Sequence, residues 1–411
     1  MIRRNVVLAM CACVGLLAWA VPATAAGRGA PKAEWRFDAW PVRLSFEVKA
    51  AGAEQTDRPV EVAVNFTEAL ATLGRQVAFE ETSLRLVEVD AQGRVTDDAI
   101  PFQFDRADDY DDSVRARGTV IFILKGTTAA DATRRFHLYF NVGGSLVVPL
   151  GMDPLIGMAE RVPYRGQESV KIVTPLATYF YHRMGGALAA MEDLDGQDWI
   201  GYRPVSGPGG GLRGIPNLAM PDNVFRPGGT KCETTIARHG PVKITLASRS
   251  DDRRWACTWE FFPKMARLTV LKADHPYWFL YEGTPGGAFD AEKSTCIRSP
   301  GRQSRLGEAW ETNLQAPRWV CFTAPEGKRG LLLLHHEPDA VADSYRAVDG
   351  QMTSFGFGRQ GVDPMMTRLP ARFSMALVED ASPAALKKAV DALYQAPEIT
   401  LGQPEVKPKA E

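Results

Sequence analysis

Short stretches in which apolar and polar residues alternate fill the first part of the chain. Alternation with a period of two is typical of a strand that buries one face of a sheet. Turn residues at 90–93 and 125–128 separate the stretches. Residues 26–145 are therefore predicted to form an antiparallel β-sandwich, with strands in RLSFEVKA, PVEVAVNF, SLRLVEVD, TVIFILK and RRFHLYFNV.

The same pattern returns in the second half of the chain. Residues 146–169 are rich in glycine and proline, which predicts a linker. A second all-β domain is expected over residues 170–396, with strands in ITLAS, ACTWEFF, ARLTVLKA, YWFLYEG, RWVCFTA, GLLLLHH and FSMALVED. Residues 397–411 have little to bury and predict a disordered tail.

One short helix is expected close to the end of the second domain. Ser382 is a good N-cap, and Pro383 suits the first helical position. The apolar positions that follow have helical spacing and predict one buried face, made of Leu386, Ala389, Val390 and Leu393.

Residues 181–200, YHRMGGALAAMEDLDGQDWI, predict a β-hairpin. Asp195 and Gly196 are typical of the positive-φ turn between antiparallel strands, and apolar residues stand on both sides of them. The pair Gly185 and Gly186 lets the backbone bend or approach another segment closely, because glycine has no β-carbon.

This hairpin resembles the opening hairpin of galactose mutarotase-like domains, in its Gly-Gly-x-apolar run followed by Asp-Gly-x-Asp-Trp-Ile. Residues 240–283, GPVKITLASRSDDRRWACTWEFFPKMARLTVLKADHPYWFLYEG, are similar to the successive long strands of that fold. The resemblance covers residues 170–396. It implies a β-supersandwich of the kind found in sugar epimerases and several polysaccharide lyases.

The first 25 residues have the pattern of a secretory signal peptide: Arg3 and Arg4, an apolar run over residues 6–21, and Ala-Thr-Ala at 23–25. We therefore expect a secreted or periplasmic protein with no membrane insertion once the signal is removed. The formal charge is −1. That balance gives no reason to expect a nucleic-acid partner.

Four cysteines remain after the signal: Cys232, Cys257, Cys296 and Cys321. Disulfides and buried free thiols are both compatible with their spacing, which is too wide for a metal knuckle. The acidic residues 108–112 and 193–198 fit solvated loop and turn chemistry better than calcium loops. No metal and no cofactor are expected.

Polar and aromatic residues at strand ends of the second domain are the expected site. The alternation of side chains along a strand places His335 and His336 on opposite faces. The expected catalytic residues are His182, His275, His335, His336, Tyr281 and Glu282. The expected substrate-binding residues are Arg203, Arg213, Asn217, Arg226, Trp278 and Glu337.

This set of residues suits sugar chemistry. Aromatic faces stack on sugar rings, and arginine can hold a uronate carboxylate bidentately. The leading hypothesis is a polysaccharide lyase that cleaves uronate-containing glycans by β-elimination, with His or Tyr moving the proton. The alternatives are a glycoside hydrolase, a sugar epimerase with Glu282 or Glu337 as base, and a non-catalytic protein that binds glycans or serves as an envelope scaffold. In each of the enzyme hypotheses the partner is a polysaccharide or oligosaccharide.

Overall fold

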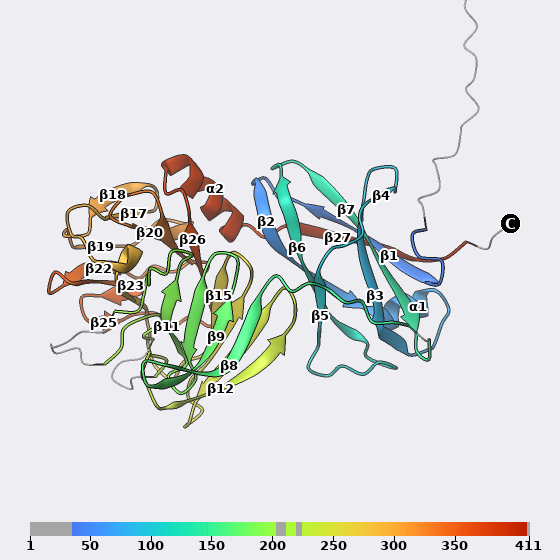
Figure 1. The fold of residues 1–411 in the computed structure, drawn as a ribbon, viewed down its shortest axis with the longest axis horizontal. Coiled ribbons are helices and arrows are strands. Elements are labelled where there is room, and N and C mark those ends of the chain that lie inside the picture. The colour runs from blue at the N-terminus through green and yellow to red at the C-terminus, as the bar shows by residue number, and fades with distance from the viewer. Residues whose placement is uncertain (1–34, 146, 203–210, 219–223, 409–411) are drawn as a thin grey trace, which may run out of the picture.

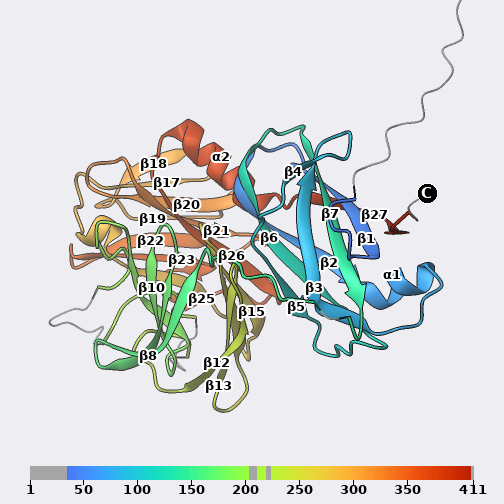
Figure 2. The same ribbon diagram turned by 45° about the vertical axis from the view of Figure 1, so that its right-hand side comes forward.

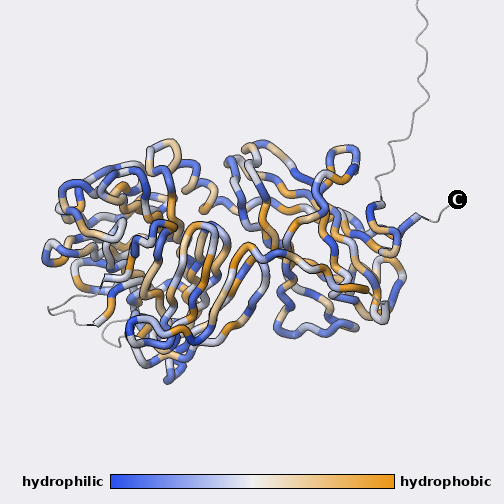
Figure 3. The backbone as a smooth tube through the Cα atoms, viewed as in Figure 1, coloured by the Kyte–Doolittle hydropathy of each residue, from blue (hydrophilic) through white to orange (hydrophobic). Residues whose placement is uncertain are grey.

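The computed structural model describes residues 35–145, 147–202, 211–218 and 224–408. The predicted signal peptide lies outside these residues. The described chain is almost entirely β-structure, which confirms the all-β prediction, and it forms two lobes that lie side by side (Figure 1). Apolar positions recur along the strands and hydrophilic ones along the turns (Figure 3).

The first lobe is a β-sandwich, as predicted. Its core lies between two sheets and is rich in phenylalanine, with the rings of Phe66 and Phe79 stacked at 4.0 Å. One sheet has the order β27 (Glu398–Val406), β1 (Val42–Lys49), β7 (Thr133–Val142), β3 (Phe79–Val89) and β4 (Val95–Asp97). The other consists of β2 (Gln55–Asn65), β6 (Arg117–Thr128) and β5 (Phe102–Arg106), and the short helix α1 (Phe66–Thr72) follows β2.

The C-terminal strand β27 corrects the prediction of a disordered tail. It pairs antiparallel with β1 from Val42↔Val406 to Lys49↔Glu398. Figure 2 shows it at the edge of the first lobe, far from the strands that precede it in sequence. Most of its side chains are exposed, so its sequence lacks a buried face, and backbone pairing is what orders it.

The second lobe contains a nine-stranded antiparallel sheet. Its strands, in spatial order, are β12 (Cys232–His239), β13 (Ile244–Ser250), β14 (Ala256–Phe261), β15 (Ala266–Lys272), β26 (Ala371–Val378), β21 (Gly330–His335), β20 (Arg318–Thr323), β17 (Thr295–Arg298) and β18 (Arg302–Arg305).

Two four-stranded sheets face one side of this sheet across the largest apolar core, which includes Tyr181, Trp199, Tyr281 and Phe322. The first consists of β11 (Ala187–Glu192), β10 (Thr178–His182), β9 (Gln167–Val173) and β8 (Gly157–Tyr164). The second consists of β16 (Phe279–Gly283), β23 (Met352–Phe357), β22 (Asp343–Val348) and β19 (Trp310–Thr312). Two short elements, β24 (Arg359–Gln360) and β25 (Asp363–Pro364), follow β23.

The segment 213–218 joins these two small sheets. Ile215 exchanges backbone hydrogen bonds of 2.6 and 3.0 Å with Leu188 of β11. On its other side, the Glu282 N–H donates to the Gly214 carbonyl at 3.1 Å. Backbone pairing therefore runs from β8 to β19, and the second lobe is a sandwich of two large sheets.

Strand β8 corrects the predicted linker. Residues 157–164 of the expected linker 146–169 form the edge strand of the second lobe. Half of its side chains are exposed and none is fully buried, so the strand lacks the continuous apolar run that would have predicted it.

The helix prediction is confirmed. Helix α2 (Pro383–Tyr394) begins after Ser382, whose side chain accepts from the Ala385 N–H, and it buries Leu386, Val390 and Leu393. These residues pack on the far face of the nine-stranded sheet together with Ile121 of β6 in the first lobe. No helix among the described residues is long and apolar enough to span a bilayer.

The prediction of a hairpin that turns at Asp195 and Gly196 is wrong, although the turn itself forms. Gly196 has φ 76° in a tight turn, and the Asp193 carboxylate accepts from the backbone N–H groups of Asp195 and Gln197. Residues after this turn make only an isolated bridge, between Glu192 and Asp198, and the strand that pairs with β11 is β10. The turn is thus ordered by Asp193, in line with turn chemistry.

The two glycines before β11 do permit a close approach. A β-carbon on Gly185 would lie 2.4 Å from the Arg226 carbonyl, and one on Gly186 would lie 2.6 Å from the Phe225 ring. Glycine at both positions lets the segment after residue 224 pack directly on the β10–β11 connection.

The four cysteines are buried and free. Cys296 and Cys321 belong to neighbouring strands, but Cys296 faces the large core and Cys321 faces the core beside α2. The disulfide alternative is therefore not formed in this structure.

Candidate functional site

Four of the predicted site residues meet at the junction of the two small sheets. We call Arg213, Asn217, Trp278 and Glu282 the Glu282 cluster. The Glu282 carboxylate lies 3.8 Å from Nη1 of Arg213 and accepts a 3.4 Å hydrogen bond from Nδ2 of Asn217. The segment 213–218 brings them together because it pairs with β11 and also bonds to Glu282.

The alternation of side chains along the strand explains where the Glu282 and Trp278 side chains of the Glu282 cluster point. Phe279 and Tyr281 of β16 point into the large core. Glu282 and Trp278 occupy the alternate positions and lie on the outer face of the sheet. The Trp278 backbone N–H donates to the Leu218 carbonyl at 3.3 Å, which ties the backbone of Trp278 to the segment that carries Arg213 and Asn217.

Three side-chain atoms of the cluster are buried without a hydrogen-bond partner: Nε of Arg213, Oδ1 of Asn217 and Nε1 of Trp278. Most buried polar atoms in proteins are paired, because an unpaired one costs about 1–3 kcal/mol. The donor of Arg213 and the acceptor of Asn217, on the two side chains that contact the Glu282 carboxylate, therefore fit a polar ligand better than a purely structural role. The side chain of Glu282 itself retains 13% of its exposure.

Arg359 is a further residue at this place that the sequence analysis did not identify. Its guanidinium lies 5.8 Å from the ring centroid of Trp278 and donates to Oγ of Ser354 at 2.8 Å. Burial lowers the pKa of Arg359, and the charge of Glu282 partly offsets this. In the sequence, Arg359 follows Gly358, which is the first residue after the apolar strand β23. This position at a strand end is the feature that could have identified Arg359 as a site residue.

Arg226 and His182 lie towards the β10 end of the same sheet. The Arg226 guanidinium lies against Gly211, two residues before Arg213. His182 is fully buried, and its Nδ1 accepts from the Gly228 N–H at 3.0 Å. Burial, followed by the charge of Arg165, lowers the pKa of His182 to about 4, so the imidazole is neutral at pH 7. Arg203 lies outside the described residues.

The other three predicted histidines do not join the cluster. His275 is half-buried in the segment before β16 and packs edge-on against Trp255 at 4.8 Å. His336 faces α2, with Nε2 2.8 Å from Oγ of Ser374 and its ring parallel to Tyr394. His335 points to the opposite side and stacks on Phe373 at 4.7 Å, which confirms the predicted alternation.

His335 and Glu337 instead line a separate cavity of about 60 Å³, together with Tyr277 and Asp339. Nδ1 of His335 lies 3.3 Å from Oδ2 of Asp339. Burial, and then the charge of Arg318, lowers the pKa of His335 to about 3. Glu337 accepts from Nε and the backbone N–H of Arg372. This arrangement is an internal polar network, with space for about one or two waters.

Tyr281 corrects the prediction of a catalytic tyrosine. It is fully buried, and its hydroxyl donates to the Trp199 carbonyl at 2.6 Å. Burial holds its pKa well above the usual value. The side chain therefore ties β16 to the turn after β11 and faces away from Glu282.

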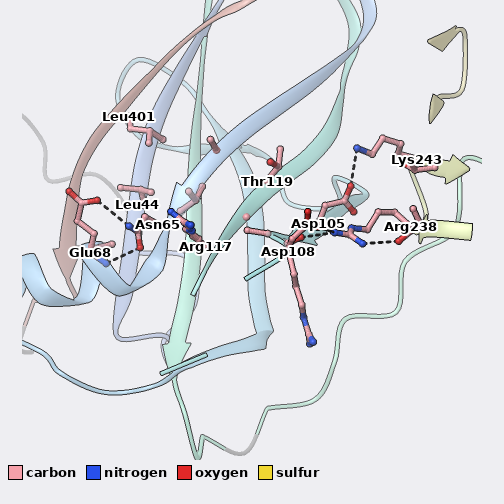
Figure 4. Close-up of a pocket in the computed structure, with 18 of the residues that line it drawn as sticks. Leu44, Asn65, Glu68, Asp105, Asp108, Arg117, Thr119, Arg238, Lys243 and Leu401 are labelled. Atoms are coloured by element: carbon pink, nitrogen blue, oxygen red, sulfur yellow. Dashed lines mark hydrogen bonds and ion pairs between the residues drawn. The ribbon is translucent and has the colours of Figure 1, made fainter. Parts of the chain in front are cut away.

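A larger cavity, of about 960 Å³, lies between the lobes (Figure 4). Asn65, Glu68 and Arg117 of the first lobe line one side, and Arg238 and Lys243 of the second lobe line the other. No sequence feature singled out this place, because its two walls are more than 100 residues apart in the chain.

Metal binding has no support in the described part of the chain. No group of three or more His, Cys, Asp or Glu side chains is arranged there to hold an ion. Among the acidic residues 108–112, Asp109 pairs with Arg117 at 2.6 Å, and Asp111 accepts from backbone N–H groups of its own loop.

Comparison with known proteins adds little to this picture. No family model matches the sequence, and no curated protein matches it. Among solved structures, the crystal structure of HI1317 is similar with a TM-score of 0.38 and 13% sequence identity, over 56% of this chain and 98% of that one. The fold therefore places the chain in the class of two-lobed all-β proteins, and the mutarotase-like family stays a prediction.

Proposed function

We propose that this protein binds a sugar at the Glu282 cluster and acts as a sugar epimerase, with Glu282 as the base. The observation that carries the proposal is the pair of unpaired buried atoms, Nε of Arg213 and Oδ1 of Asn217, on the two side chains that contact the partly exposed Glu282 carboxylate. Sugars carry neighbouring hydroxyl groups that both donate and accept, so they suit such a mixed set.

Each member has a distinct task in this proposal. The Glu282 carboxylate accepts the proton of the anomeric hydroxyl while the bond between C1 and the ring oxygen breaks, and the ring oxygen takes a proton from water. Ring closure on the other face of C1 reverses both proton transfers and gives the other anomer. The Arg213 guanidinium and the Asn217 amide hold oxygens of the same ring, and they also position the carboxylate. Trp278 supplies an N–H donor and an aromatic surface at the edge of the cluster.

The β-elimination hypothesis receives less support. It assigns the proton transfer to a histidine or tyrosine beside arginine groups. The described contacts of His182 and His335 are with the Gly228 N–H and with Asp339, away from Glu282 and Arg213, and Tyr281 faces the core. The guanidinium of Arg213 still suits a uronate carboxylate, so uronic acids belong among the sugars tested.

The test measures anomer exchange of aldoses and uronic acids by NMR, in the presence of the purified protein. We expect exchange faster than the spontaneous rate, and a loss of at least about 100-fold in Glu282→Gln, which keeps the shape and removes the base. Glu337→Gln is the matched control, because Glu337 also has a buried side chain with an arginine partner but lies outside the cluster.

Three outcomes would separate the alternatives. An unsaturated product from a uronate polymer would favour the lyase, and new reducing ends without it would favour a hydrolase. Saturable sugar binding without exchange, unaffected by Glu282→Gln, would favour a binding protein. No binding and no exchange with any sugar would overturn the proposal.

A further inference from the structure

The cavity between the two lobes has the properties of a second binding site, independent of the Glu282 cluster. Its volume of about 960 Å³ is at the upper end of the range for small-molecule sites. One wall comes from β1, β2, β5, β6, α1 and β27, and the other from β12 to β14. A ligand here would therefore contact both lobes at once.

Most of the charged residues that line the cavity are already paired with an opposite charge within the protein, whereas Glu68 accepts a hydrogen bond from Asn65. Lys243 lies 2.9 Å from Asp105 and 3.1 Å from Glu260. Arg238 and Arg117 pair with acidic residues of the first lobe at 3.4 and 2.6 Å. A charged ligand would have to displace one of these partners, so the cavity favours an uncharged ligand.

The second wall presents hydroxyl and methyl groups. Thr245, Ala247 and Thr258 of β13 and β14 line it. Thr245 is only 8% exposed, and its Oγ1 is buried without a hydrogen-bond partner. The residues before and after it, Ile244 and Leu246, point into the large core, so the hydroxyl points to the cavity side of the sheet.

We infer that this cavity binds an uncharged, hydroxyl-rich molecule of oligosaccharide size, with Thr245 as one of its hydrogen-bond partners. The volume exceeds what a single sugar ring needs, and the paired charges exclude strong binding of polyanions. No aromatic residue is among those that line the cavity, so hydrogen bonds carry the recognition.

The test titrates the full chain with neutral hexamers of glucose and of xylose, and with hexagalacturonate, by calorimetry. We expect a neutral hexamer to bind at least about tenfold more tightly than hexagalacturonate, since the charges are paired. Ala247→Trp and Thr258→Trp fill the cavity and are expected to abolish this binding. Thr269→Trp is the matched control, because Thr269 pairs with Thr258 on β15 but lies outside the lining.

Thr245→Val tests the hydroxyl without adding bulk. Loss of one hydrogen bond is expected to weaken neutral-hexamer binding about three- to tenfold. The melting temperature of the free protein should stay the same or rise, because a buried unpaired group is removed. A variant that loses stability and keeps full affinity would assign Thr245 a structural role and would contradict the inference.

The inference is overturned if neither neutral hexamer binds, if hexagalacturonate binds as well as they do, or if Thr258→Trp and Thr269→Trp behave alike. Glu282→Gln should leave binding in this cavity unchanged, and Thr258→Trp should leave anomer exchange unchanged. Failure here therefore leaves the proposed epimerase intact, and failure of anomer exchange leaves this site intact.

Discussion

Lys243 of the second lobe and Asp105 of the first meet at 2.9 Å across the boundary between the lobes. Lys243 is 5% exposed, and its ammonium also contacts Glu260 and Glu61. Arg267 pairs with the same two glutamates, so two cations hold three carboxylates together. The neighbouring acids hold the pKa of Lys243 above its usual value although burial opposes this.

Replacing Lys243 with Met should destabilise the protein strongly. The variant leaves Asp105 and Glu260 without one of their counter-charges in a buried place, and breaking such a cluster costs about 3–5 kcal/mol. Urea unfolding measures the loss. Lys264→Met is the control, because Lys264 pairs with Asp57 on the exposed surface, and there we expect about 0–1 kcal/mol. Equal losses in the two variants would contradict this account.

Removal of residues 397–411 should destabilise the first lobe. Strand β27 covers the edge of β1, and Ile399 packs on the phenylalanine-rich core. We expect a loss of at least about 2 kcal/mol from the backbone ladder and this burial. Hydrogen exchange of the β1 amides should become faster.

Removal of residues 409–411 alone is the matched control for this truncation, since it leaves β27 whole. No change in β1 exchange is expected there. If the long truncation also left β1 protected, the strand pairing would not contribute to the stability of the lobe.

Asp343 should give the protein an unusual pH dependence. Burial raises its pKa to about 7, although the Gly358 and Leu314 N–H groups bond to its carboxylate. The folded state therefore binds this proton more tightly than the unfolded state does. Its contribution to stability is largest at low pH and is lost as pH rises from about 4 through about 7.

The comparison of wild type with Asp343→Asn isolates this contribution. The free energy of unfolding of wild type, minus that of the variant, should be smaller at pH 8 than at pH 5. Asp290→Asn is the control, because backbone N–H bonds lower the pKa of the exposed Asp290, so the corresponding difference should not vary over this range. A constant difference for Asp343→Asn would mean that its carboxyl does not titrate near neutral pH.

The histidine hypothesis shows where local sequence reasoning reached its limit. Alternation predicted that His335 and His336 point to opposite faces, and they do. It could not predict what packs against each face. Helix α2 lies about 50 residues further along the chain, and Phe373 belongs to β26, the strand that pairs with β21. A large β-protein has many strand ends, so residues at strand ends need not lie close to one another. Only some of the expected site residues therefore do.

The sequence by itself determined the all-β class, the first sandwich, the capped helix α2 and the turn at Asp193, because these depend on residue periodicity and on hydrogen bonds between near neighbours. Only the tertiary structure decided that β27 completes the first lobe, that segment 213–218 joins the two small sheets beside Glu282, and that Lys243 meets Asp105. Backbone pairing between distant segments needs no particular side chains on the exposed face. Such contacts therefore leave little trace in the order of residues.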